Sequence, residues 1–238
     1  MKKTRKIISL LLSILMIITS VPLMALNSFA ASSGDYEYEL LKDGTAQIKH
    51  YKGSETEIEI PSEIDGHRVT FIGSGAFKGC TSLTSVTIPD SITEIYPFVL
   101  DECDSLCTIN VAANNMNYSS ENGVLFDKEK TLLIRYPQKK NDKTYTIPDS
   151  VTEINSSAFS GCTLIENVII PDSTTFVGRW AFEACTSLIS VTIGNGVTYL
   201  GDEAFDGCIS LEIVSIGSGI EEVGYECFAC CDSIKTAN

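Results

Sequence analysis

The chain has 238 residues, with 17 basic and 31 acidic side chains and a formal net charge of −14 at pH 7. A field of that sign repels nucleic acid and anionic membrane surfaces, so neither is expected as a partner. Hydrophobic residues make up 44% of the chain, the proportion of a globular protein rather than of a disordered one.

The first 30 residues have the pattern of a secretory signal peptide. Four basic residues precede an apolar run from Ile7 to about Ala25, and Ser28-Phe29-Ala30 has the small-x-small pattern that signal peptidase accepts. We therefore expect cleavage after Ala30, a secreted protein that is extracellular or held at the cell surface, and no membrane span in the mature chain. A retained membrane anchor is the alternative. Cleavage would leave 13 basic against 31 acidic residues, a charge of about −18.

A motif recurs from residue 72 to the end of the chain, with the pattern I-G-x-x-A-F-x-G-C-x-S-L-x-x-V-x-I. Its cysteine recurs mostly at intervals of 23 residues, at Cys80, Cys103, Cys162, Cys185, Cys208 and Cys231. A fixed period with apolar residues at fixed phases indicates a solenoid, in which each coil must stack on its neighbours to bury its apolar side. The L-x-x-V-x-I part alternates like a half-buried strand, whereas A-F-x-G-C predicts a tight helical or 3-10 turn.

Two segments depart from this period. Residues 31–71 precede the first repeat and contain an Asp43-Gly44 dipeptide, which favours a hairpin turn. The interval from Cys103 to Cys162 is 59 residues, so 36 extra residues are inserted, at about 112–147. Within them, two apolar runs surround a charged turn at 127–130, which predicts a β-hairpin. The hairpin either covers an irregular junction or projects to contact a partner.

These windows resemble the BspA-like leucine-rich repeat, a class of extracellular bacterial solenoids with coils of about 23 residues. The resemblance covers essentially the whole mature chain, and residues 31–71 resemble the amino-terminal cap of that family. The expected fold is therefore a β-rich leucine-rich-repeat solenoid (72–238) with short strands and tight turns, an N-terminal β cap (31–71) and one inserted hairpin. The resemblance also implies contact with host or neighbouring-cell proteins.

The in-phase cysteines are expected to be free and buried. Equivalent positions of stacked coils lie roughly 4.8 Å apart, whereas a disulfide requires about 3.5–4.5 Å between Cβ atoms. Such thiols act as small apolar spacers. Cys107, Cys227 and Cys230 are out of phase, and Cys227-x-x-Cys230-Cys231 has no second pair and no suitable histidine for zinc. Substituted core positions or a local disulfide are the alternatives for them, and no metal or cofactor is expected.

The sequence contains no recognisable catalytic motif. The two histidines, His50 and His67, precede the repeats, and neither lies in a motif that pairs histidine with a nucleophile. Carboxylates recur at Asp90, Asp149 and Asp172, and a pair of them would suit a glycosidase, but equivalent positions of successive coils form an exposed acidic row by default. The sequence therefore predicts a protein that is not an enzyme, with a carbohydrate-active enzyme as the weakest alternative.

The outward residues of the strands are the candidate binding face, which we expect to be one continuous sheet surface. The candidate residues are Thr84, Ser85, Thr87, Thr108, Asn110, Glu166, Asn167, Ser190, Thr192, Glu212 and Ser215. Ile169 and Ile189 also face outward on this surface. Hydroxyl, amide and acidic side chains suit contacts with protein or glycan. Tyr96, Arg179, Trp180 and Tyr199 vary between coils and serve either as binding anchors or as covers of the convex side.

The sequence thus predicts a secreted or cell-surface, non-enzymatic binding or adhesion module for an extracellular protein or glycan of a host or neighbouring cell. A structural scaffold within a larger wall-associated protein is the alternative. In the last coil Ala237 occupies the valine phase and no polar capping repeat follows, so an open apolar face is expected there. That face would serve self-association, or the coils would continue in a longer protein.

Overall fold

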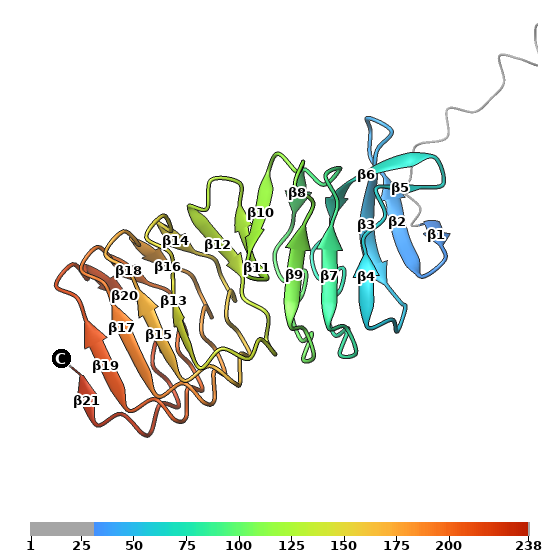
Figure 1. The fold of residues 1–238 in the computed structure, drawn as a ribbon. Coiled ribbons are helices and arrows are strands. Elements are labelled where there is room, and N and C mark those ends of the chain that lie inside the picture. The colour runs from blue at the N-terminus through green and yellow to red at the C-terminus, as the bar shows by residue number, and fades with distance from the viewer. Residues whose placement is uncertain (1–30, 238) are drawn as a thin grey trace, which may run out of the picture.

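The computed structural model describes residues 31–237, and they form an elongated stack of β-coils (Figure 1). The predicted leucine-rich-repeat solenoid is confirmed, with a β cap at one end and a hairpin inserted between coils. The proposed signal peptide lies outside the described residues. Within the described part, no helix has the length and apolar character that crossing a membrane requires.

The cap joins an antiparallel ribbon to a parallel stack. Its strands are β1 (Ala31–Ser33), β2 (Tyr36–Leu40), β3 (Ala46–Tyr51), β5 (Glu63–Ile64) and β6 (His67–Ile72). β2 and β3 pair antiparallel around the Asp43-Gly44 turn that the sequence predicts, and β3 then pairs in parallel with β6. The antiparallel strands therefore cover the edge at which the parallel stack begins.

One strand of each coil lies on the same side of the stack. These strands are β4 (Glu57–Glu59), β7 (Ser85–Ile88), β9 (Thr108–Val111), β13 (Thr144–Thr146), β15 (Asn167–Ile170), β17 (Ser190–Ile193), β19 (Ile213–Ile216) and β21 (Thr236–Ala237). The last five pair in parallel at a register of 23 residues, so that Val168, Val191 and Val214 lie in a row. These valines are buried, which confirms the predicted strand alternation.

Each coil has a second, shorter strand that the sequence analysis did not predict. These strands are β8 (Glu94–Ile95), β14 (Glu153–Ile154), β16 (Phe176–Val177), β18 (Tyr199–Leu200) and β20 (Glu222–Val223). Two residues are too few to show a period of two, so the strand pattern is invisible in the sequence.

The inserted segment forms three antiparallel strands: β10 (Tyr118–Glu121), β11 (Val124–Asp127) and β12 (Leu132–Arg135). The β11–β12 hairpin around the charged turn is the one that the sequence predicts. β10 was missed, although Asn122-Gly123 is a strong hairpin signal and both residues adopt positive φ, 52° and 80°. β12 then pairs in parallel with β14, which returns the chain to the stack.

The A-F-x-G-C segments are turns, and the helical or 3-10 form expected for them is not adopted in residues 31–237. Their amides alternate in direction: Ala181 N–H bonds back to Gly178 O at 3.3 Å, whereas Phe182 N–H bonds to Ala204 O of the next coil at 2.7 Å. A helix would direct every amide along its own axis. Left-handed residues such as Trp180, with φ of 56°, interrupt the helical path and turn alternate amides toward the neighbouring coil.

A column of aromatic rings runs through the core. Tyr136, Phe159, Phe182, Phe205 and Phe228 stack on one another with centroid distances between 4.6 and 5.0 Å. Because Tyr136 belongs to the inserted segment, the column shows that the insertion contributes to the core and does not merely cover it. Ring stacking at these distances adds to the stability from apolar burial.

The in-phase thiols also have a polar role. Cys185 Sγ donates to Phe159 O at 3.2 Å, and Cys208 Sγ donates to Phe182 O at 3.1 Å, in each case one coil back. All nine cysteines are free, so the local disulfide considered for the last coil is not formed. Cys227 is buried whereas Cys230 is exposed, so the two side chains occupy different environments.

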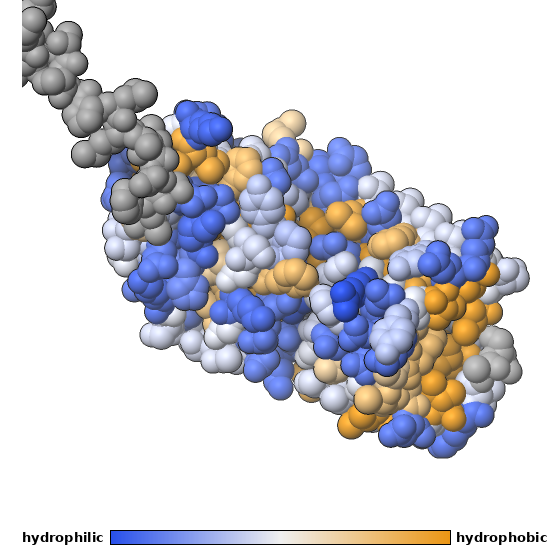
Figure 2. All heavy atoms as spheres, turned by 180° about the vertical axis from the view of Figure 1, so that it is seen from behind, coloured by the Kyte–Doolittle hydropathy of each residue, from blue (hydrophilic) through white to orange (hydrophobic). Residues whose placement is uncertain are grey.

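The last coil exposes apolar side chains. Val223 is 52% exposed, Tyr225 is 70% exposed and Ile234 is 37% exposed. Figure 2 shows a hydrophobic surface at this end of the stack, far from the cap.

We expect thiol chemistry to separate the cysteines by environment. Burial raises the pKa of the Cys103 and Cys162 thiols to about 12, from 9.0, which lowers their thiolate fraction at pH 8 about a thousandfold. Iodoacetamide should therefore modify exposed Cys107 first. Cys230 should react more slowly, because the Asp206 charge raises its pKa, and the buried pair should react only after unfolding. Peptide mass spectrometry measures this order, and cross-linked in-phase cysteines would contradict the structure.

Candidate functional site

The insertion divides the candidate binding face into two sheets, so the continuous face expected from the sequence is wrong. β4, β7 and β9 form one sheet, and β13, β15, β17, β19 and β21 form another. The reason is that the hairpin occupies the edge of β9: Gly123 O accepts from Ile109 N–H at 2.9 Å, and Ser120 Oγ accepts from Val111 N–H at 3.1 Å. β9 therefore has no parallel neighbour on this side.

The predicted residues are distributed over both sheets. Ser85, Thr87, Thr108 and Asn110 lie on the smaller sheet, and Asn167, Ser190, Thr192 and Ser215 lie on the larger one. The other three, Thr84, Glu166 and Glu212, precede strands and make bonds within the fold. Thr84 Oγ1 donates to Thr56 O at 2.8 Å, and the two glutamates pair with Lys143 and Lys235 at 2.6 and 2.7 Å.

The larger sheet also exposes isoleucines that the candidate set omits. Ile169, 40% exposed, lies opposite Thr192, and Ile213, 43% exposed, lies opposite Ser190. The strand pattern predicts the outward position of Ile169, and Ile213, which the sequence prediction does not include, has the same outward phase in its own strand. The larger sheet therefore presents apolar and hydroxyl groups side by side.

The insertion also creates a cleft on the turn side of the stack, which the sequence analysis missed. The cleft has a volume of about 780 Å³ and reaches from the turn of Phe98 to the turn of Trp180. In regular coils, a turn amide donates a hydrogen bond to a carbonyl of the next coil, as Gly161 N–H does to Glu183 O at 2.9 Å. In the first coil after the insertion, the carbonyl at the position of Glu183 is that of Ser160.

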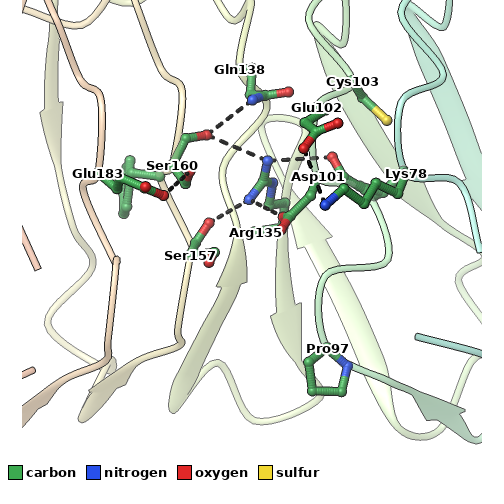
Figure 3. Close-up of polar contacts among 12 residues, drawn as sticks. Lys78, Pro97, Asp101, Glu102, Cys103, Arg135, Gln138, Ser157, Ser160 and Glu183 are labelled. Carbon is green, nitrogen blue, oxygen red and sulfur yellow. Dashed lines mark hydrogen bonds and ion pairs between the residues drawn. The ribbon is translucent and has the colours of Figure 1, made fainter. Parts of the chain in front are cut away.

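Side chains of the insertion replace the missing turn at this carbonyl. Gln138 Nε2 donates to Ser160 O at 3.1 Å, and Arg135 donates to Leu100 O at 3.3 Å and to Ser157 O (Figure 3). Arg135 and Gln138 are 5% and 6% exposed. They therefore form a buried polar floor that bridges the coils on either side of the interruption.

Two ion pairs lie in the cleft. Arg135 pairs with Asp101 at 3.0 Å, and Lys78 pairs with Glu102 at 3.1 Å. Burial raises the pKa of Asp101, and the neighbouring Arg135 charge opposes that rise. A loss of Arg135 would therefore leave a buried carboxylate without its counter-charge.

Two aromatic residues flank the cleft in unusual backbone conformations. Phe98 and Trp180 have φ of 61° and 56°, and their ring centroids lie 6.3 Å apart. The same phase is Gly75 in the first coil and Glu203 in a later one. A bulky side chain in this left-handed region costs about 1–2 kcal/mol, and both instances border the cleft. Trp180, a candidate anchor or cover, is thus at the cleft edge.

Residues 49–132 and 136–238 match the model of the BspA type leucine rich repeat region, in six copies. The chain belongs to this family. A search of curated proteins finds no match.

Across residues 31–237 the structure contains no group of three histidine, cysteine or acidic side chains arranged to hold a metal ion.

Solved structures of several bacterial leucine-rich repeat proteins have a similar fold. A leucine rich cell surface protein from Faecalibacterium prausnitzii is 23% identical with a TM-score of 0.58, over 88% of each chain. The Treponema protein TpLRR (T. pallidum) is 24% identical with a TM-score of 0.52, over 87% of this chain and 91% of its own. The pneumococcal vaccine antigen PcpA is 21% identical with a TM-score of 0.60, over 76% and 56%. At these identities the likeness concerns the fold.

We expect Arg135→Met to destabilise the protein by about 3–5 kcal/mol at pH 7, because it strands the Asp101 carboxylate and removes donors from buried carbonyls. The loss should shrink as the pH falls toward 4, since Asp101 has a raised pKa in the fold and protonation removes the buried charge. Urea unfolding measures both effects. The double variant with Asp101→Leu should recover part of the stability at pH 7, and a single-variant cost below about 1 kcal/mol would contradict the buried floor.

Proposed function

We propose that this protein is a non-catalytic binding module that works outside the cell and holds a partner protein on its larger sheet. The observation that carries the proposal is the mixture of exposed isoleucines and hydroxyl side chains on β15, β17 and β19. Apolar groups surrounded by polar ones are typical of protein interfaces. A glycan site would use aromatic platforms, and the strands β15, β17 and β19 contain no aromatic residue.

This surface is suited to recognition because its outward side chains do not pack in the core. Ser190 and Thr192 face outward and alternate with buried Val191 and Ile193, and parallel pairing on both sides holds the strand in register. Their chemistry can therefore change without loss of packing. The leader-like amino end and the cell-surface protein of similar fold support an extracellular setting.

Binding of mature residues 31–238 to panels of extracellular proteins and glycans tests the proposal. We expect Thr192→Arg, at the centre of the larger sheet, to weaken capture of a bound protein at least about tenfold, because the long cation covers Ile169. Thr87→Arg makes the same change on the smaller sheet and is the matched control. Circular dichroism should show both variants folded.

Equal loss in both variants, or in neither, would count against the larger sheet as the binding surface. Absence of any protein ligand would favour the alternative, a structural scaffold within a larger wall-associated protein. Selective capture of glycans would move the partner to the other class.

Self-association through the last coil is a second proposal, supported by the exposure of Val223, Tyr225 and Ile234. Sedimentation over a range of concentrations measures it. We expect concentration-dependent dimers that Val223→Lys reduces, because a charge would have to be buried in the contact. A monomer at all concentrations would exclude this association.

A further inference from the structure

The cleft beside the insertion contains a buried hydrogen-bond acceptor without a partner. Gln138 Oε1 accepts no hydrogen bond from any described residue, although the side chain is 6% exposed. The amide cannot be turned over, because its nitrogen donates to Ser160 O and the reversed amide would place two oxygens together. In Figure 3 the Gln138 oxygen points away from Ser160, in the direction of Glu102, which lines the cleft. A buried acceptor without a donor is unfavourable, so a donor from a ligand would be stabilising here.

The charges around this acceptor are predominantly negative. The carboxylates that line the cleft are those of Asp101, Glu102, Asp104 and Glu183. Asp101 and Glu102 are paired with Arg135 and Lys78. Asp104 and Glu183 form no ion pair with a basic side chain of residues 31–237, and the Glu183 carboxylate accepts a hydrogen bond from Ser160 Oγ at 3.2 Å. The cleft therefore has an excess of hydrogen-bond acceptors and negative charge, which favours a positively charged ligand with hydrogen-bond donors.

The aromatic edge of the cleft already shows how this fold holds a guanidinium group. The Arg179 guanidinium lies 3.8 Å from the Trp180 ring centroid and pairs with Glu203 at 2.8 Å. Phe98, 38% exposed, offers a second ring beside the unpaired carboxylates of the cleft. An aromatic ring next to a carboxylate favours organic cations through the ring quadrupole and direct charge pairing.

From these observations we infer that the cleft binds an arginine- or lysine-bearing segment of a partner protein. The cationic side chain lies against Phe98, donates to Gln138 Oε1 and pairs with Asp104 and Glu183. A volume of about 780 Å³ exceeds that of one side chain and accommodates a short stretch of peptide. The inference rests on the proposed function, since it assigns a charged contact to the same protein partner.

Trp180 provides a direct probe because it is the single tryptophan of the chain and borders the cleft. We would titrate the folded mature protein with the blocked peptide Gly-Arg-Gly-Arg-Gly and follow tryptophan fluorescence. The matched ligand is the same peptide with citrulline, which keeps the shape and removes the charge. We expect the arginine peptide to bind at least about tenfold more tightly and to weaken as salt is raised.

Two cleft variants, each with a control, test whether the peptide binds in the cleft. Asp104→Asn removes one charge without changing shape, and Asp90→Asn makes the same change outside the cleft as a control. Phe98→Gly removes the ring at a position whose left-handed backbone glycine adopts without strain, and Glu226→Gly is its control at the same phase of the last coil. We expect each cleft variant to weaken arginine-peptide binding at least about threefold and each control to leave it unchanged.

Several results would overturn the inference. Equal binding of the citrulline peptide, tighter binding of a neutral oligosaccharide, or no fluorescence change would exclude a cation site. Spermidine binding as tightly as the peptide would assign the site to free polyamines. If a partner protein responds to Thr192→Arg but not to Asp104→Asn or Phe98→Gly, the cleft inference fails while the proposed function stands. If no partner protein is found, the peptide titration still decides the cleft.

Discussion

Backbone pairing between coils at a constant offset of 23 residues is the constraint on which the rest of the structure depends. Strand amides and alternate turn amides both bond to the neighbouring coil, so every coil must have the same length to keep both sets of bonds. The same offset aligns Phe159, Phe182 and Phe205 into one column. Core packing, thiol placement and surface rows all follow from this single register.

The insertion shows what happens when the register is broken. β11 separates two hydrophobic clusters of the core. Leu125 packs in the cluster on the cap side, whereas Val124 and Phe126 pack in the cluster that extends to the last coil. Both sides are filled, so the core tolerates the interruption. The turn side is not filled by backbone, and Arg135 and Gln138 supply the missing hydrogen bonds with side chains. A cleft with a polar floor is the consequence.

The two candidate surfaces therefore have different origins. The larger sheet is a product of regular repetition, and its chemistry depends on which residues occupy outward phases such as those of Ile169 and Thr192. The cleft is a product of interruption, and its chemistry depends on residues that replace repeat positions, chiefly Phe98 and Trp180. A single partner that contacts both surfaces would have to wrap around an edge of the stack, since strands and turns lie on different sides of each coil.

The sequence by itself determined the solenoid, its longer strands, the cap hairpin, the β11–β12 hairpin and the burial of five of the six in-phase cysteines, because period and alternation are local properties of the chain. Cys80, in the first repeat, is only half-buried. The sequence did not reveal the two-residue strands, which are too short for a period. Only the tertiary structure decided that the hairpin caps the edge of β9 and divides the face, that Arg135 reaches Asp101 across 34 residues, and that Phe98 and Trp180 meet at one cleft. Those contacts join segments outside the common register, and such pairings are set by how the coils pack in space.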